Sequence, residues 1–263
     1  MESYKPSLNA LTQNGRVAGH EPKDLTGMLR GGRLTLSKEQ QKFIEGINEI
    51  AEVLDSKGLK RSSWMVIAGG GVFLYQLSNY GSSKPERIDR NPTDLDVVID
   101  NTVSNGLILD SIKGAFSYPA TVNKEPVMHY GHLLKGPTLS TNATNGLDVD
   151  IITELSQEYP KDHRFAPSAE YRYPLAKTLL AQAKTYRHPL INGEIKVAHP
   201  GFIAFYKLML YRDSNGKQDT ADIRRLKALG ALERSEELDT VLATMCHGDA
   251  RLVEAIRKAI DEI

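Results

Sequence analysis

Two short segments in which aspartate alternates with apolar residues constrain the fold of this chain more than any other feature. They read Asp94-Leu-Asp-Val-Val-Ile99 and Leu147-Asp-Val-Asp-Ile-Ile-Thr153. Alternation together with β-branched residues indicates strands. Because side chains two positions apart on a strand share a face, Asp94 and Asp96 are expected to point to the same side, as are Asp148 and Asp150.

The remaining pattern predicts a mixed α/β chain. Ser37 and Gln40 have capping-box spacing at the start of an amphipathic helix over about 38–55. Residues 64–68 are expected to form a strand, followed by a turn at Gly69, Gly70 and Gly71 and a helix over 72–77. Asn192-Gly193 predicts a hairpin turn. Further expected elements are a helix near 102–116, short strands near 127–134, hairpin strands at 186–191 and 194–198, and helices near 200–212, 217–229, 234–246 and 249–262.

These elements divide the chain into three predicted parts. Residues 1–36 form an N-terminal arm, because glycines and prolines stand there among polar residues with too few apolar residues for a core. Residues 37–198 form a mixed-sheet core with flanking helices, and residues 199–263 form a helical bundle. The expected fold class is therefore α/β (α+β), with His199 at the start of a helix.

Composition excludes little. Lysine plus arginine and aspartate plus glutamate number 33 each, so net charge gives no reason to expect indiscriminate binding to nucleic acid or anionic membrane. The single cysteine, Cys246, is expected to be a buried apolar residue, and it fits a reducing compartment. No apolar run approaches the roughly 20 residues that span a bilayer, and no secretory signal begins the chain. No membrane contact and a cytoplasmic location are expected.

The paired aspartates suggest metal chemistry. Carboxylates about 6–7 Å apart on one strand face repel by roughly 2–3 kcal/mol at an effective dielectric near 20. Mg²⁺ offsets such repulsion, since it binds one or two carboxylates together with substrate phosphates. If the two aspartate strands are neighbours, the acids could hold two ions, one promoting attack by an acceptor hydroxyl and one stabilising a pyrophosphate leaving group. The alternative interpretation is that these aspartates only face solvent on exposed strands.

The glycines offer a place for the phosphates. Backbone amides at a turn that opens a helix form an anion site, and glycine lets a ligand approach closely. A purely structural turn would explain Gly69, Gly70 and Gly71 as well. Lys207 lies in the otherwise apolar stretch Phe205-Tyr-Lys-Leu-Met209, so it needs a carboxylate, a phosphate or an outlet to solvent.

The order of these features resembles the DNA polymerase beta superfamily of nucleotidyltransferases, and most of all the abortive-infection (AbiEii) type toxin nucleotidyltransferases. The resemblance rests on Gly-Gly followed by Arg90-Asn-Pro-Thr-Asp94-Leu-Asp96, and then on Lys207, Arg212 and Asp219-Thr-Ala-Asp222. It covers roughly residues 66–226. The chain departs from many superfamily members in having Gly-Gly-Gly where they have Gly-Ser.

The resemblance implies roles for particular residues. Asp94, Asp96 and a third aspartate would hold Mg²⁺ or Mn²⁺, while Arg90 and Lys207 would neutralise phosphate charge. The third acid is open between Asp148 and Asp150, with Asp150 preferred because Ile151 and Ile152 follow it as in a buried strand. The expected catalytic residues are Asp94, Asp96, Asp150 and Lys207, and the expected nucleotide-binding residues are Gly69, Gly70, Arg90, Thr93, Lys207 and Asp222.

Alternatives remain for Asp219 and Asp222, which could simply cap a helix, and Asp222 could instead orient Lys207 or Arg212. The activity implied is transfer of a nucleoside monophosphate from a nucleoside triphosphate such as ATP to a tRNA or protein acceptor, in a toxin that would have an antitoxin partner. A small-molecule, antibiotic-modifying nucleotidyltransferase is one alternative function. A non-catalytic nucleotide-binding module is another.

Overall fold

A computed structural model describes residues 28–29, 32–80, 87–100, 105–116, 118–123, 127–129, 133–135, 137–153, 155–158, 172–174, 176–209, 216–246 and 248–263. The helices are α1 (Lys38–Ser56), the 3₁₀ helix η2 (Arg61–Ser63), α2 (Ala68–Asn79), α3 (Asn105–Lys113), α4 (Ala176–Gln182), α5 (Pro200–Met209), α6 (Gly216–Ala228), α7 (Glu236–Met245) and α8 (Ala250–Glu262). The strands are β1 (Met28–Leu29), β2 (Gly32–Arg33), β3 (Trp64–Val66), β4 (Asp94–Ile99), β5 (Thr121–Asn123), β6 (Val127–His129), β7 (Leu133–Lys135), β8 (Thr138–Asn142), β9 (Asp148–Ile152), β10 (Leu155–Glu158), β11 (Arg172–Pro174), β12 (Lys184–Arg187) and β13 (Glu194–Val197).

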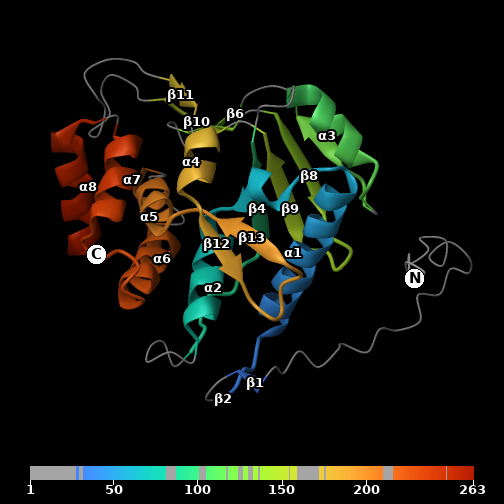
Figure 1. Cartoon of the computed structure of the whole chain (residues 1–263), viewed down its shortest axis with the longest axis horizontal. Helices are drawn as coiled ribbons and strands as arrows, with labels where there is room; N and C mark the ends of the chain where they lie inside the picture. Colours follow the sequence, from blue (N-terminus) through green and yellow to red (C-terminus); the bar gives the residue numbers. More distant parts are fainter. Residues whose placement is uncertain are drawn as a thin grey trace, which may run out of the picture.

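A seven-stranded mixed sheet forms the centre of the fold, with helices around it (Figure 1). Its strand order is β12-β13-β3-β4-β9-β8-β5. The pairs β13–β3 and β4–β9 are parallel, and the other neighbours are antiparallel. A four-stranded sheet, β11-β10-β7-β6, and the pair β1-β2 complete the described strands. The predicted α/β class is confirmed.

Alternation along β4 and β9 sends their side chains into two separate cores. Val97 and Ile151 belong to the apolar cluster that includes α1 and α3. Val98 and Ile152 belong to the other cluster, which includes residues of α4 to α8. Asp94 and Asp96 have the same parity as Val98, and the aspartates of β9 have the parity of Ile152. The acids therefore lie on the sheet face that the C-terminal helices cover.

The C-terminal helices share a core with β3 and α2. The cluster that holds Met65 and Val72 also contains Phe202, Val241 and Ile256 from α5, α7 and α8. The helical bundle thus packs directly on the sheet, and its four helices lie close to their predicted positions. Leu34 and Leu36 are buried in the other cluster. The division at residues 36 and 198 stays a prediction.

Several local predictions are confirmed. Ser37 caps α1 and forms the reciprocal capping box with Gln40. The strand of Asp94 to Ile99 has its predicted bounds, and β9 lies within its predicted segment. Cys246 is buried at the end of α7. The short strands expected near 127–134 correspond to β6 and β7.

One turn prediction is wrong, and the predicted hairpin is confirmed with a longer loop than expected. Helix α2 begins at Ala68, so the three glycines lie inside its first turns and not in a turn before it. Ala68 itself makes the bend, with φ at 53°. The hairpin between β12 and β13 pairs Arg187 with Glu194, which leaves a six-residue loop over 188–193 in place of a two-residue turn. That loop is tied to α1, where the Asn48 side chain accepts from the Asn192 amide at 2.8 Å.

Other elements were not predicted from the sequence. The elements without a predicted counterpart are β1, β2, η2, β5, β8, β10, β11 and α4, and α3 is shorter than expected. Across the described ranges, no helix combines the length and the hydrophobicity needed to cross a bilayer. Arg212 lies outside the described residues.

His199 stands at the start of α5, as predicted, and its Nδ1 accepts from the Gly201 amide at 3.1 Å. Burial, assisted by the charge of Lys184 and opposed by Glu237, lowers the pKa of His199 to about 4. The unfolded chain therefore binds a proton between about pH 6.5 and pH 4 that the folded protein does not. We expect about 2–3 kcal/mol of stability, present above pH 6.5, to be lost as pH falls through this window.

Urea denaturation at several pH values measures this loss. The variant His199→Asn keeps an oxygen acceptor at the start of α5 but has no titrating group. It should lack this part of the pH dependence. An identical pH profile in the two proteins would contradict the assignment.

Candidate active site

Four aspartates form two adjacent rows on one face of the sheet. Strands β4 and β9 are parallel and in register, with Asp94 opposite Asp148 and Asp96 opposite Asp150. Neighbouring strands lie about 4.8 Å apart. The expectation that the two aspartate strands are neighbours is confirmed. Asp94 and Asp148 are exposed, whereas Asp96 and Asp150 are half-buried, closer to the apolar end of the strands.

Neighbouring hydroxyl and amide groups hold three of these carboxylates. Ser140 of β8 donates to Asp150 at 2.6 Å, and Asn142 donates to Asp148. Thr93, a predicted nucleotide-binding residue, lies beside the acid rows and donates to Asp94 at 3.4 Å. Ser140 and Asn142 were not predicted as site residues; they lie on β8, which pairs with β9 and alternates between buried and less buried residues.

The acid rows suit a hard divalent cation that the substrate completes. Among the residues that the structure describes, no three or more histidine, cysteine, aspartate or glutamate side chains are gathered into a group that could hold an ion by themselves. Mg²⁺ commonly takes only one or two protein carboxylates and fills its remaining positions with phosphate oxygens and water. Asp96 and Asp150, opposite each other on neighbouring strands, supply that kind of donor set.

The start of α2 lies beside the acid rows. The Ile67 amide donates to the Asp96 carbonyl at 3.1 Å, directly before the helix begins. Ala68 then adopts the left-handed conformation, which is uncommon for residues other than glycine. The side chain of the N-cap residue, Ile67, makes no capping hydrogen bond. Uncapped amides at a helix N-terminus are donors available to an anion.

Each of the three glycines makes room for a different neighbour. A Cβ atom on Gly69 would lie 2.2 Å from Nη2 of Arg90, and one on Gly70 would lie 2.5 Å from the Phe43 ring. A Cβ on Gly71 would meet Ile203 at 2.7 Å. Gly70 and Gly71 therefore allow α2 to pack against α1 and α5. Only Gly69 opens onto a charged group, the predicted phosphate-binding Arg90.

Gly69→Ala should displace the Arg90 guanidinium, because Cζ and Nε of Arg90 also lie within 3.4 Å of the added atom. We expect a loss of about 1–3 kcal/mol in the free energy of unfolding. The matched control is Gly114→Ala, since no described atom lies within 4 Å of a Cβ there. Urea denaturation of both variants is the measurement, and equal stability of the two would contradict the contact.

A buried group of ion pairs connects Arg90 to the C-terminal helices. Asp222, with 0% of its side chain exposed, contacts Nε of Arg90 at 3.0 Å, Nζ of Lys207 at 2.9 Å and Nη1 of Arg225 at 2.9 Å. Lys207 also pairs with Asp219 at 2.8 Å. Lys207 was expected to need a carboxylate, a phosphate or solvent near its charge, and the structure provides two carboxylates. One of them, Asp222, holds the Lys207 ammonium at 2.9 Å. Both aspartates are paired with buried cations, which goes beyond capping α6.

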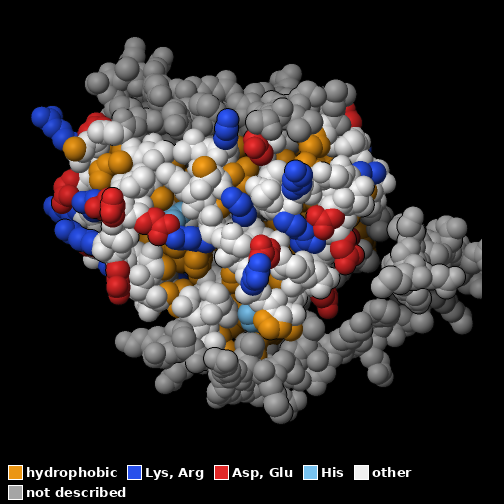
Figure 2. All heavy atoms as spheres, viewed as in Figure 1, with side chains coloured by type: hydrophobic (Ala, Val, Ile, Leu, Met, Phe, Trp, Pro, Cys, Tyr) orange, Lys and Arg blue, Asp and Glu red, His pale blue; other side chains and the backbone are white. Residues whose placement is uncertain are grey.

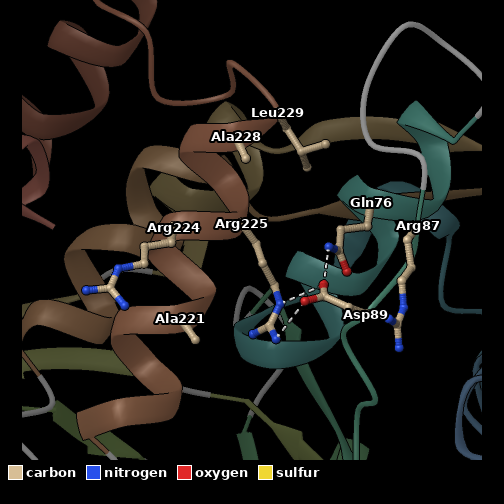
Figure 3. A pocket seen from close by; sticks show the side chains of 8 residues that line it. All are labelled: Gln76, Arg87, Asp89, Ala221, Arg224, Arg225, Ala228 and Leu229. Atoms are coloured by element: carbon tan, nitrogen blue, oxygen red, sulfur yellow. Dashed lines mark hydrogen bonds and ion pairs between the residues drawn. The ribbon is translucent and has the colours of Figure 1, made fainter.

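Asp89 extends these pairs to the surface. It accepts from Gln76 at 2.7 Å and from Nε and Nη2 of Arg225 at 2.9 and 3.2 Å, as Figure 3 shows. Burial raises the pKa of Asp89, but the hydrogen bonds from Arg225 and Gln76 outweigh burial and lower the pKa below its ordinary value. A pocket of about 620 Å³ opens here between α2 and α6. It is lined by Gln76, Arg87, Asp89, Ala221, Arg224, Arg225, Ala228 and Leu229.

The ion-pair group is electrically balanced. Three cations face three carboxylates, so neither Arg90 nor Lys207 brings uncompensated charge to the site; the members are Arg90, Lys207, Arg225, Asp89, Asp219 and Asp222. A phosphate would therefore share these cations with the aspartates. On the face seen in Figure 2, basic and acidic side chains are intermingled, in keeping with the neutral composition.

Comparison of the chain with protein-family models and with curated proteins gave no match. The resemblance to the nucleotidyltransferases therefore rests on the motifs and on the arrangement of the residues described above.

Proposed function

We propose that the chain is a metal-dependent nucleotidyltransferase that transfers a nucleoside monophosphate from a nucleoside triphosphate to an acceptor and releases pyrophosphate. One observation carries the proposal: in-register aspartates on β4 and β9 lie beside the start of α2, where the N-cap residue Ile67 supplies no side-chain cap. Carboxylates for a cation and backbone amides for phosphates are thus next to each other. Either group alone would be unremarkable in a protein of this size.

Each residue has a stated part in the reaction. Asp94, Asp96 and Asp150 hold Mg²⁺ or Mn²⁺, which neutralises charge on the reacting and departing phosphates. The first amides of α2, at Gly69 and Gly70, bind the triphosphate. Arg90, whose guanidinium lies against Gly69, adds a charged donor.

Lys207 and Asp222 are proposed to act through Arg90 and not by direct contact with the nucleotide. Lys207 supports the positive charge next to the phosphates, and Asp222 keeps both cations in place through its ion pairs. Thr93 lies next to Asp94 at the open end of β4, where the nucleotide would enter.

The acceptor is proposed to be a tRNA or a protein, in a cytoplasmic toxin with an antitoxin partner. The test is a labelled-NTP assay with total tRNA, cell protein and aminoglycosides as separate acceptor pools, run with each of the four nucleotides and Mg²⁺. The Asp94→Ala, Asp96→Ala double variant is the inactive control. Label in tRNA or protein supports the proposal, whereas label only in aminoglycosides favours the antibiotic-modifying alternative.

The same protein preparation distinguishes a non-catalytic nucleotide-binding module from an enzyme. It would bind Mg²⁺ and nucleotide in equilibrium titration but label no pool and release no pyrophosphate. That result would overturn the proposed transfer.

A further inference from the structure

Two buried glutamines from different helices hold the segment that carries Arg90. Gln40 of α1, 2% exposed, donates through Nε2 to the carbonyl oxygens of Ile88 and Arg90, each at 3.1 Å. Gln76 of α2, 4% exposed, donates through Nε2 to Asp89 at 2.7 Å and accepts from the Arg90 amide at 3.0 Å. Side chains thus supply to residues 88–90 the hydrogen bonds that a neighbouring strand would otherwise supply.

Both amide groups are fixed at their oxygen and at their nitrogen. The oxygen of Gln40 accepts from the Ser37 amide at 2.9 Å while its nitrogen donates to the 88–90 segment. Gln40 therefore has two roles: it completes the capping box of α1, and it holds the backbone of residues 88–90, about fifty positions away. We call Gln40 and Gln76 together the glutamine clamp. A buried amide without partners is costly, whereas one with all its partners is rigid.

Because the glutamine clamp fixes the backbone of Arg90, it limits the positions that the Arg90 guanidinium can occupy. Its guanidinium lies against Gly69, and its Nε is 3.0 Å from Asp222. With the Gln218 amide turned so that its oxygen faces the guanidinium, that oxygen accepts from Nη1 and Nη2 at 2.7 and 2.9 Å. The backbone of Arg90 is fixed by the glutamines, and the far end of its side chain is fixed by α6.

We infer that Gln76 and Gln40 are positioning residues for nucleotide binding, which hold Arg90 at the start of α2, where it meets the triphosphate. The inference rests on the proposed function, in which Arg90 binds phosphate. Neither glutamine touches the nucleotide. A displacement of about 1 Å in a charged binding group can weaken its action many-fold, and loss of the clamp permits such a displacement.

The test is Gln76→Leu, which keeps the size of the side chain and removes both hydrogen bonds. The matched control is Gln182→Leu, because Gln182 also links two elements, donating to Thr244 at 3.0 Å between α4 and α7. We expect Gln76→Leu to weaken Mg²⁺-dependent binding of a nonhydrolysable NTP by about tenfold, as a rise in Kd and KM with a smaller change in kcat. Gln182→Leu should leave the affinity unchanged. Gln76→Glu keeps the acceptor for the Arg90 amide but sets a carboxylate against Asp89, so it should not restore the affinity.

A second measurement follows Arg90 directly. The Nε–H resonance of Arg90 in ¹⁵N-labelled protein, assigned by its loss in Arg90→Lys, should shift or broaden in Gln76→Leu and not in Gln182→Leu. Lost affinity with an unmoved resonance overturns the positioning role, as does Gln76→Leu protein that binds nucleotide like the wild type. Wild-type protein that binds no NTP overturns the proposed function as well.

Discussion

Asp96→Asn is expected to lower NTP-dependent transfer by at least about a thousandfold, because loss of a metal carboxylate removes several kcal/mol of stabilisation from the transition state. The free energy of unfolding should not decrease. Asp96 lies opposite Asp150 on the neighbouring strand, so neutralising it removes repulsion between these two carboxylates when no metal is bound. The free energy of unfolding of the metal-free protein should therefore be unchanged or higher. The measurements are labelled-nucleotide transfer and urea denaturation of the same preparation.

Asp148→Asn and Asp150→Asn form a matched pair that identifies the third acid. Both residues are on β9, but Asp150 is opposite Asp96 and half-buried, whereas Asp148 is opposite Asp94 and exposed. We expect Asp150→Asn to be nearly inactive and Asp148→Asn to keep most activity. Asp96→Asn with wild-type activity would refute the catalytic assignment of the acid rows.

Asp222→Ala is expected to lose about 3–5 kcal/mol in the free energy of unfolding. The carboxylate is fully buried and paired with Arg90, Lys207 and Arg225. Its removal leaves the buried Arg90 without its carboxylate partner and Lys207 with Asp219 alone, and an unpaired buried charge costs far more than an exposed one.

The control for this change is Asp261→Ala. Asp261 also pairs with an arginine, Arg234, at 3.2 Å, but both side chains are more than half exposed. Such a pair contributes at most about 1 kcal/mol. Chemical denaturation at neutral pH compares the two variants. An Asp222→Ala protein that unfolds at the same urea concentration as Asp261→Ala would show that the ion pairs around Asp222 do not stabilise the fold.

Local pattern predicted the elements that hold the acids. Alternation set the bounds of β4, the Ser37 capping box set the start of α1, and helical periodicity located the four C-terminal helices. In each case, the residues that predict the element are neighbours in the sequence. The pairing of β4 with β9 could only be a hypothesis from the sequence, because about fifty residues separate the two strands. It was suggested by the acids on both strands, which could bind the same metal ions if the strands were neighbours.

Contacts between distant residues were beyond local pattern. Gln40 reads as a capping residue from its spacing to Ser37, and nothing near it in the sequence indicates its bonds to Ile88 and Arg90. The glycines were read as a turn because glycine favours turns, but their small size serves close packing against Arg90, Phe43 and Ile203, from three different elements. For Asp222 the sequence leaves nucleotide binding, capping and orientation of Lys207 or Arg212 open, because its three cations converge only in the folded protein.

Crystals grown with Mn²⁺ and a nonhydrolysable nucleoside triphosphate would locate the proposed site directly, since the anomalous scattering of manganese marks each bound ion. The proposal predicts an ion in contact with Asp96 and Asp150 and with phosphate oxygens, and a triphosphate whose other oxygens meet the amides that follow Ala68. Manganese and triphosphate bound away from β4 and β9 would contradict the claim that these strands build the active site.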